Sequence, residues 1–272
     1  MYAESLKAGL LLYDQRSKLF TLWKRMQRWM TKGSSSIVIV GAGGTGKSTL
    51  GQLLAQGPTG IAQPQRYRES MTVETLRLSG NVPATLLVAP GQERRRTRTL
   101  PGLLRDIASR RRLGIIHVVS HGYHSLGEEV SFRELPEYQK GMTARRFLDR
   151  YVESCRQREL DVLREIEPHL LAVKQPFWML TLVTKQDLWW DDRAAVRRVY
   201  ESGSYGTLID GIQSQRGAER FTHEYVSASL VAQNLCSGNN ELLAKTTAGY
   251  DDAIQLANLI TVFDAVERFA SL

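Results

Sequence analysis

Apolar and polar residues alternate along the chain in patterns that predict strands and helices in turn. Short apolar runs at residues 37–40, 113–119 and 176–183 are typical of strands that are buried on both faces. Segments 3–31 and 251–271 instead place apolar residues three, four or seven positions apart, which is the spacing of one helix face. We also expect a hairpin with strands at 72–78 and 84–88 and a later strand at 221–226. Two further helices are expected, one from 143 to about 168–170 and one at 191–200.

The order of these elements predicts the fold class. Strands that alternate with helices through short connections indicate an α/β fold with a mostly parallel sheet and helices on both faces. We expect one domain over residues 36–272, preceded at 1–35 by a basic amphipathic helix and a short Gly-Ser linker. Residues 121–142 are polar and contain Gly, Ser and Pro, which predicts a loop inserted before the third core helix.

The strand at 37–40 leads into a glycine-rich turn with the sequence GAGGTGKS, and a helix-like pattern follows. Glycines let successive backbone N–H groups point into one concavity, and a helix N-terminus extends this concavity into a phosphate-binding nest. In the G-x-x-x-x-G-K-S pattern, the lysine reaches the β- and γ-phosphates and the serine hydroxyl binds Mg²⁺. The nucleotide-binding residues expected in this loop are Gly41, Gly43, Gly44, Thr45, Gly46, Lys47, Ser48 and Thr49.

Composition narrows the class of protein. The chain has 272 residues, enough for a sizeable core, and contains no run of roughly 18 apolar residues of the kind that spans a membrane. Its two cysteines, Cys155 and Cys236, lie far apart, which favours a reducing compartment over a disulfide scaffold. The first residues do not have the order of a secretory signal. We therefore expect a cytoplasmic protein.

The net charge of +8 is concentrated in two segments. Residues 1–32 carry seven basic and two acidic side chains, and residues 94–112 carry eight arginines and one aspartate. A basic amphipathic helix with tryptophans can lie on an anionic membrane, dock on another protein, or pack its apolar stripe on its own domain. All three roles stay open for the stripe of the first helix, which consists of Leu12, Leu19, Trp23, Met26 and Met30.

A group of three histidines invites a metal-binding interpretation. His117, His121 and His124 begin in an expected strand and end in a loop, so they do not share a helix face. No cysteine lies nearby to complete a ligand set. We therefore do not expect a metal site at these histidines.

The order of short motifs resembles that of the Ras-like P-loop GTPases over residues 36–270. After the phosphate loop come a switch threonine, Pro-Gly-Gln after the third strand, Thr-Lys-x-Asp after the fifth and Ser-Ala after the sixth. All but the threonine follow the carboxyl end of an expected strand, where open α/β sheets bind ligands. The Ala-Pro-Gly-Gln variant looks most like the bacterial Ras-like group that includes gliding-motility GTPases. The resemblance implies a P-loop NTPase fold that binds GTP or GDP with Mg²⁺.

The resemblance also implies how a base would be recognised. The Asp187 carboxylate would accept hydrogen bonds from guanine N1–H and the amino group, so that adenine would leave a buried acceptor unpaired. The Lys185 stem would pack along the base, and the Ala228 N–H would donate to the guanine oxygen. Thr184 stands where asparagine is more usual, which implies weaker support of the phosphate loop. The base-side residues expected are Thr184, Lys185, Asp187, Ser227, Ala228 and Ser229.

The Pro-Gly-Gln motif implies that the nucleotide is hydrolysed. Gln92 occupies the position that orients the attacking water, and the Gly91 N–H would contact the γ-phosphate, so that residues 91–100 would sense the nucleotide state. Thr72 is our choice for the threonine that closes on Mg²⁺, with Thr75 as its competitor. The resemblance thus implies the catalytic residues Gln92, Lys47 and Thr72 and the metal ligands Ser48 and Thr72.

Two features depart from the family pattern or go beyond it. Val88 stands three residues before Gly91, where the family has an aspartate that helps to hold Mg²⁺, so we expect weaker Mg²⁺ binding or slower hydrolysis. Four arginines follow Gln92. One of them could act in cis on the transferred phosphoryl group; they could also bind an acidic partner or nucleic acid, or form a solvated helix face. These are Arg94, Arg95, Arg96 and Arg98.

Three functions are open at this point. The first is a GTPase switch, in which segments around Thr72 and 91–100 change with the nucleotide and signal to an effector or regulator protein. The second is a GTP-binding scaffold with little hydrolysis, which Val88 favours and Gln92 opposes. It would act on a partner or a membrane through the basic helix at residues 1–32 and the inserted long helix. A P-loop kinase for a small acceptor would make the Thr-Lys-Gln-Asp match accidental. Nucleic acid is the partner that we favour least.

Overall fold

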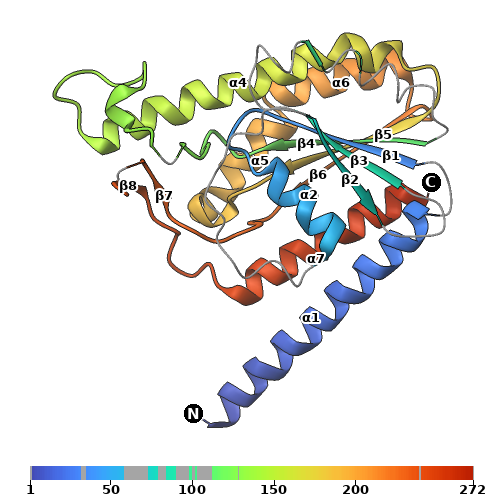
Figure 1. The fold of residues 1–272 in the computed structure, drawn as a ribbon, viewed down its shortest axis with the longest axis horizontal. Coiled ribbons are helices and arrows are strands. Elements are labelled where there is room, and N and C mark those ends of the chain that lie inside the picture. Colours follow the sequence, from blue (N-terminus) through green and yellow to red (C-terminus); the bar gives the residue numbers. More distant parts are fainter. Residues whose placement is uncertain are drawn as a thin grey trace.

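The computed structural model describes residues 2–31, 35–57, 73–78, 84–89, 98–99, 102, 112–127, 129–238 and 240–271. Its centre is a six-stranded sheet with the order β2-β3-β1-β4-β5-β6 (Figure 1). β2 runs antiparallel to β3, and the other neighbouring pairs are parallel. The strands are β1 (Ser35–Val40), β2 (Glu74–Leu78), β3 (Ala84–Val88), β4 (Arg112–Val119), β5 (Phe177–Val183) and β6 (Phe221–Ser227).

Helices cover both faces of this sheet (Figure 1). Their bounds are α1 (Tyr2–Thr31), α2 (Lys47–Gln56), α4 (Ala144–Ala172), α5 (Arg193–Glu201), α6 (Ser204–Arg216) and α7 (Asp252–Ser271). One apolar cluster joins the sheet to α1, α2 and α7, and a second joins it to α4, α5 and α6. The expected fold class, a mostly parallel α/β sheet with helices on both faces, is therefore confirmed.

The central strands are apolar along their length because helices cover both of their faces. All seven residues of β5, with the sequence FWMLTLV, are buried. This is the composition of a parallel strand between two helical layers. The carboxyl ends of β1, β4, β5 and β6 meet at one edge of the sheet, since these strands are parallel. Any ligand bound at that edge would contact the turns that follow all four strands.

The first helix packs on its own domain. α1 lies along α7, and its Leu19 and Met26 are fully buried in the same apolar cluster as Phe263. The indole Nε1–H of Trp23 donates to the carbonyl of Leu54 in α2 at 3.0 Å. Of the three roles open to this stripe, its described part serves the core of the domain, while the N-terminal end of α1 extends beyond the other elements (Figure 1). Among the described residues, no helix combines the length and hydropathy needed to cross a membrane.

Two elements were not expected from the sequence. α6 has the sequence SYGTLIDGIQSQR, whose two glycines and scattered apolar residues weaken the helical pattern. A small hairpin of β7 (Leu235–Cys236) and β8 (Leu242–Ala244) lies between β6 and α7. The expected insertion at 121–142 contains one short 3-10 helix, η2 (Phe132–Glu134), which packs with the start of α4 and this hairpin in a third apolar cluster.

Candidate nucleotide-binding site

The turn from β1 to α2 has a backbone that only glycine fits. Gly41, Gly44 and Gly46 have φ angles of 151°, 75° and 98°. A Cβ atom on Gly41 would lie 2.2 Å from the carbonyl oxygen of Val118, and one on Gly44 would lie 2.5 Å from the carbonyl oxygen of Ser125. The glycines therefore let the loop curl tightly against the ends of neighbouring segments.

The N-terminus of α2 opens onto this loop. Gly46 occupies the N-cap position in the left-handed conformation, and no side chain among the described residues caps the helix there. The Lys47 ammonium donates to the carbonyl of Ala42 at 2.7 Å, and the Thr45 hydroxyl donates to the same carbonyl at 3.0 Å. Lys47 thus lies along the concave side of the loop. A helix N-terminus with a lysine beside it forms a site for an anion.

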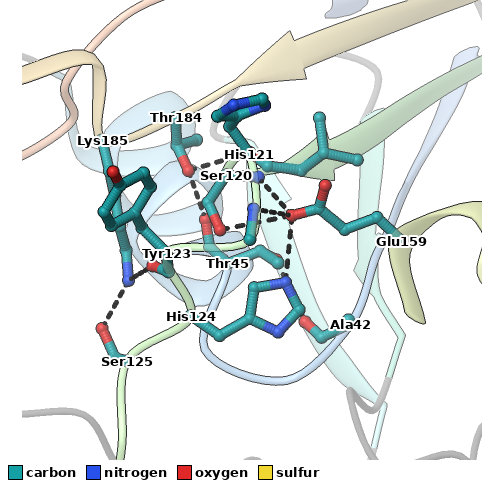
Figure 2. Close-up of polar contacts among 12 residues, drawn as sticks. Ala42, Thr45, Ser120, His121, Tyr123, His124, Ser125, Glu159, Thr184 and Lys185 are labelled. Carbon is teal, nitrogen blue, oxygen red and sulfur yellow. Dashed lines mark hydrogen bonds and ion pairs between the residues drawn. The ribbon is translucent and has the colours of Figure 1, made fainter. Parts of the chain in front are cut away.

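Thr184 fastens the phosphate loop to the sheet. Its hydroxyl lies 2.7 Å from the carbonyl oxygen of Thr45 and 3.0 Å from that of Val119 at the end of β4 (Figure 2). The hydroxyl has a single proton, which the two acceptors share. The sequence implied weaker support at this position than an asparagine would give. The structure shows that the threonine contacts the loop directly.

Residues 120–125, which follow β4, also contact the phosphate loop. The Ser125 N–H donates to the carbonyl of Gly44 at 3.0 Å. The Lys185 ammonium donates to the carbonyl of Tyr123 at 2.5 Å and to the Ser125 hydroxyl at 2.8 Å (Figure 2). Burial lowers the pKa of Lys185 to about 7, against a partly offsetting attraction from Asp187. The head of Lys185 is therefore held by this segment.

A buried carboxylate behind the loop holds residues 120–124 in place. Glu159 of α4 accepts hydrogen bonds through Oε1 from the N–H groups of Ser120 at 2.8 Å and Gly122 at 3.1 Å and from His124 Nε2 at 3.0 Å (Figure 2). Its other oxygen, Oε2, accepts one from the Tyr200 hydroxyl at 2.5 Å. Burial alone would raise the pKa of Glu159, but these donors lower it to about 2. Burial lowers the pKa of His124, while its hydrogen bond with Glu159 acts against this shift.

This group was not predicted from the sequence, because no motif marks Glu159. One signal could have found it. Glu159 lies four residues after Cys155 and four before Leu163, so it interrupts the apolar stripe that faces the core. A charged residue inside such a stripe is buried only with partners.

Asp187 follows β5 in the 3-10 helix η3 (Gln186–Leu188), at the same edge of the sheet as the phosphate loop. The residue is only 1% exposed. Oδ1 accepts the Ser229 hydroxyl, and Oδ2 accepts the Gln233 N–H at 3.1 Å and the Thr246 hydroxyl at 3.0 Å. Burial raises the pKa of Asp187, while these donors act against the shift. Both oxygens that the resemblance assigns to guanine already have partners within the chain.

The other expected base-side residues are also bonded to one another. The Ala228 N–H donates to the carbonyl of Val183 at 3.1 Å and so continues the pairing of β6 with β5. The side-chain amide of Gln186 donates to the Ser227 hydroxyl at 2.9 Å. The fold gathers these residues at one edge, as expected, but a role of Ala228 toward guanine requires its present bond to be given up.

Several expected catalytic residues lie outside the described residues. These are Thr72, Gly91, Gln92, Arg94, Arg95 and Arg96. Thr75, the competitor for the switch threonine, is exposed in β2 opposite Leu87. Arg98 is also exposed. The roles of this group stay predictions from the sequence.

The structure brings one unexpected residue to the phosphate loop. Oε1 of Glu74, the first residue of β2, lies 3.1 Å from the Ser48 hydroxyl, the expected Mg²⁺ ligand. Val88, where the family has its aspartate, is fully buried and faces Glu74 across the hairpin. The expected hairpin already contained this pairing, because strands at 72–78 and 84–88 place residue 74 opposite residue 88.

The three histidines do not converge. His117 Nδ1 lies 2.7 Å from the Tyr205 hydroxyl, and His124 contacts Glu159. The ring of His121 packs edge-on against Tyr200. Within the part of the chain that the structure describes, no group of three potential metal-binding side chains is found.

Comparison with known proteins gives structural likenesses only. No protein-family model and no curated protein matches the chain. Similar solved structures include Toc33 from Arabidopsis thaliana with GDP and Mg²⁺ (13% identity, 95% of this chain and 96% of that chain, TM-score 0.47). A second is the small COPII coat GTPase Sar1 from Encephalitozoon cuniculi with GDP (15% identity, 100% of this chain and 96% of that chain, TM-score 0.37). A third is the signal recognition particle receptor SRb–GDP from Chaetomium thermophilum (15% identity, 73% of this chain and 90% of that chain, TM-score 0.39). All three TM-scores lie below 0.5, so we base no functional conclusion on them.

Proposed function

We propose that this chain is a GTP-binding and GTP-hydrolysing molecular switch, which converts GTP and water into GDP and phosphate with Mg²⁺. The phosphate loop carries the proposal: three glycines with positive φ, an α2 N-terminus that no described side chain caps, and Lys47 within the concavity. These features together suit the phosphates of a nucleotide. The position of Asp187 at the same edge supports guanine as the base, and the Ala-Pro-Gly-Gln sequence supports a bacterial-type variant.

Phosphate binding would exchange one partner of Lys47 for a stronger one. Its ammonium now bonds to the neutral carbonyl of Ala42, and an anionic phosphate oxygen is a better acceptor. The N–H groups in the first turn of α2 point the same way and add the positive end of the helix dipole. As charge develops on the transferred phosphoryl group, these fixed donors stabilise it without reorganisation. Gln92 would orient the attacking water, as its place in the sequence implies.

The residues around Ser48 fit a small divalent cation. The Ser48 hydroxyl and the Glu74 carboxylate are oxygen donors 3.1 Å apart at the start of α2. Mg²⁺ prefers oxygen ligands and is usually held by one or two side chains together with substrate phosphates and water. Bound there, Mg²⁺ would neutralise the negative charge of the phosphates. Thr72 would join Ser48 as a ligand in the GTP state.

Guanine recognition by Asp187 requires an exchange of hydrogen-bond partners. Oδ2 now accepts two donors from residues 233 and 246, and Oδ1 accepts one from Ser229. The N1–H and amino groups of guanine would replace one present donor at each oxygen, so that the carboxylate keeps its hydrogen bonds. We propose that this exchange couples base binding to the segment 233–247.

One alternative is favoured by a specific observation. The base-side residues are closed on one another, and Val88 removes a carboxylate, which would suit a GTP-binding scaffold with little hydrolysis. A P-loop kinase is the second alternative. Incubation with GTP and Mg²⁺ separates the three: the switch yields GDP and free phosphate, the scaffold yields neither, and the kinase yields a phosphorylated acceptor only when an acceptor is added.

The remaining proposals concern location and partners. We propose a cytoplasmic protein whose segments around Thr72 and 91–100 contact an effector or regulator protein in the GTP state. The described apolar stripe of α1 is buried on α7, so a membrane role would need other parts of residues 1–32. Co-sedimentation of the full chain with anionic liposomes tests that role, and no sedimentation above neutral liposomes would dismiss it.

A further inference from the structure

The hairpin places Glu74 beside the position where the phosphate loop lacks a carboxylate. Glu74 of β2 and Val88 of β3 are directly opposite in antiparallel register. Opposite residues in such a pair extend to the same face of the sheet, with Cβ atoms roughly 5 Å apart. Val88 belongs to the same apolar cluster as Leu50 and Leu53 of α2, so it lies on the face of the sheet that α2 covers. A side chain at residue 74 therefore extends toward the start of α2.

The length of the Glu74 side chain suits a carboxylate that comes from β2 instead of β3. Neighbouring strands lie about 4.8 Å apart, so a carboxylate on β2 has farther to reach than one on β3. Glutamate is one methylene longer than aspartate. The Glu74 carboxylate spans the gap and reaches the Ser48 hydroxyl at 3.1 Å.

The contact also orients Ser48 for a cation. A serine hydroxyl has one proton and two lone pairs. Because Glu74 accepts the proton, the lone pairs of Ser48 Oγ are directed away from the carboxylate and are free to bind a cation. The carboxylate adds one negative charge next to that oxygen, which favours a divalent cation.

We infer that Glu74 supplies, from the neighbouring strand, the carboxylate that holds Mg²⁺ at the phosphate loop and that Val88 does not provide. The inference rests on the proposed function, since Mg²⁺ binds here together with nucleotide phosphates. The sequence predicted weaker Mg²⁺ binding because of Val88. With Glu74 in this role, the site keeps a carboxylate and Mg²⁺ binding is not weakened. Glu74 acts as a positioning residue through Ser48 and through the water around the cation.

The test is the Mg²⁺ dependence of nucleotide release, which needs no hydrolysis. The dissociation rate of a fluorescent GDP analogue is measured in excess EDTA and across a Mg²⁺ titration, for the wild type and Glu74→Gln. The amide keeps an acceptor for Ser48 and removes only the charge. We expect equal rates in EDTA, and a Mg²⁺ concentration for half-maximal slowing that rises by about tenfold or more in the variant. Glu134→Gln, an exposed glutamate in the insertion, serves as the matched control and should not shift the titration.

Two further measurements keep the result interpretable. Mn²⁺ binding to the GDP complex, followed by electron paramagnetic resonance, should weaken by a similar factor in Glu74→Gln, whatever the turnover. Adding Val88→Asp to Glu74→Gln should bring the Mg²⁺ midpoint back toward the wild type, provided that circular dichroism shows a folded protein.

The outcomes separate the inference from the function on which it rests. A Mg²⁺ midpoint and Mn²⁺ affinity that do not change in Glu74→Gln, with normal GDP binding, would overturn the role of Glu74 and leave GTP binding intact. If the wild type binds no guanine nucleotide at all, the proposed function fails and the inference fails with it.

Discussion

The hydroxyl of Thr246 lies 3.0 Å from Oδ2 of Asp187, one of the two oxygens that a guanine base would need. A donor from the chain thus occupies the acceptor of the proposed base site. The segment that carries Thr246 also donates its Thr247 N–H to the Asp187 carbonyl at 2.7 Å. A guanine base and the segment that carries Thr246 would therefore compete for hydrogen bonds to the Asp187 carboxylate.

Removing the competing hydroxyl should strengthen nucleotide binding. Thr246→Val preserves the shape of the side chain and leaves Oδ2 with one donor fewer. Because a hydrogen bond contributes about 1 kcal/mol net, we expect GDP to bind about fivefold more tightly. The Kd of a fluorescent GDP analogue measures this. Thr261→Val on the exposed side of α7 is the control. Weaker binding by Thr246→Val would show instead that Thr246 supports Asp187 in the bound state.

Thr184 should control how long a nucleotide stays bound. Thr184→Val keeps the volume but removes the hydroxyl that donates to the carbonyl of Thr45, while the Val119 carbonyl keeps the Thr184 N–H at 2.8 Å. A buried acceptor without a partner costs roughly 1–3 kcal/mol, so we expect GDP dissociation to accelerate by about tenfold. Thr184→Ser keeps the hydroxyl and should retain a rate near that of the wild type. Equal dissociation rates for the valine and serine variants would exclude this role.

Glu159 should make the fold sensitive to acid. Its folded-state pKa of about 2 lies below the ordinary value of 4.5, so its contribution is fully present above about pH 4.5 and is lost as the pH falls toward 2. The shift corresponds to roughly 3 kcal/mol. Glu159→Gln should therefore unfold at lower urea concentration at pH 7 and show a flatter dependence on pH below 4.5. Glu153→Gln, on the exposed side of the same helix, is the comparison. Parallel pH curves for the wild type and Glu159→Gln would contradict the network.

The packing of α1 should contribute to the stability of the whole domain. Met26 is fully buried between α1 and the α7 layer, and truncation of a buried methionine to alanine typically costs 2–5 kcal/mol. Met26→Ala should lower the free energy of unfolding by that amount. Because α1 belongs to the domain, the variant should still unfold in urea in one cooperative transition. Lys24→Ala, at an exposed position of the same helix, should change it little. Equal stability of the two variants would mean that α1 does not pack on α7 in solution.

Much of the fold could be predicted from the sequence because its strongest signals are local. Apolar runs such as residues 37–40 and 176–183 give buried strands, and GAGGTGKS defines the turn between β1 and α2. α6 was missed because two glycines and polar residues obscure its period, and its helix forms by packing Tyr205, Ile209 and Ile212 on the sheet. Local patterns do not report that kind of tertiary stabilisation.

The site shows the same division. Lys47, Ser48 and Asp187 carry motifs and were placed at the correct edge of the sheet. Glu74 and Glu159 carry none, because their roles depend on pairing across a hairpin and on packing between elements far apart in the chain. The engagement of the Asp187 carboxylate by Thr246 joins residues 59 positions apart, which no spacing along the sequence indicates.

The central claim is that the phosphate loop and Asp187 together bind a guanine nucleotide. The most direct measurement is a competition titration, in which GTP, GDP and ATP displace a fluorescent GDP analogue in the presence of Mg²⁺ from the wild type and from Asp187→Ala. We predict displacement by GTP and GDP but not by ATP in the wild type, and loss of this preference in Asp187→Ala. Equal displacement by ATP, or no binding of the analogue to the wild type, would contradict the account.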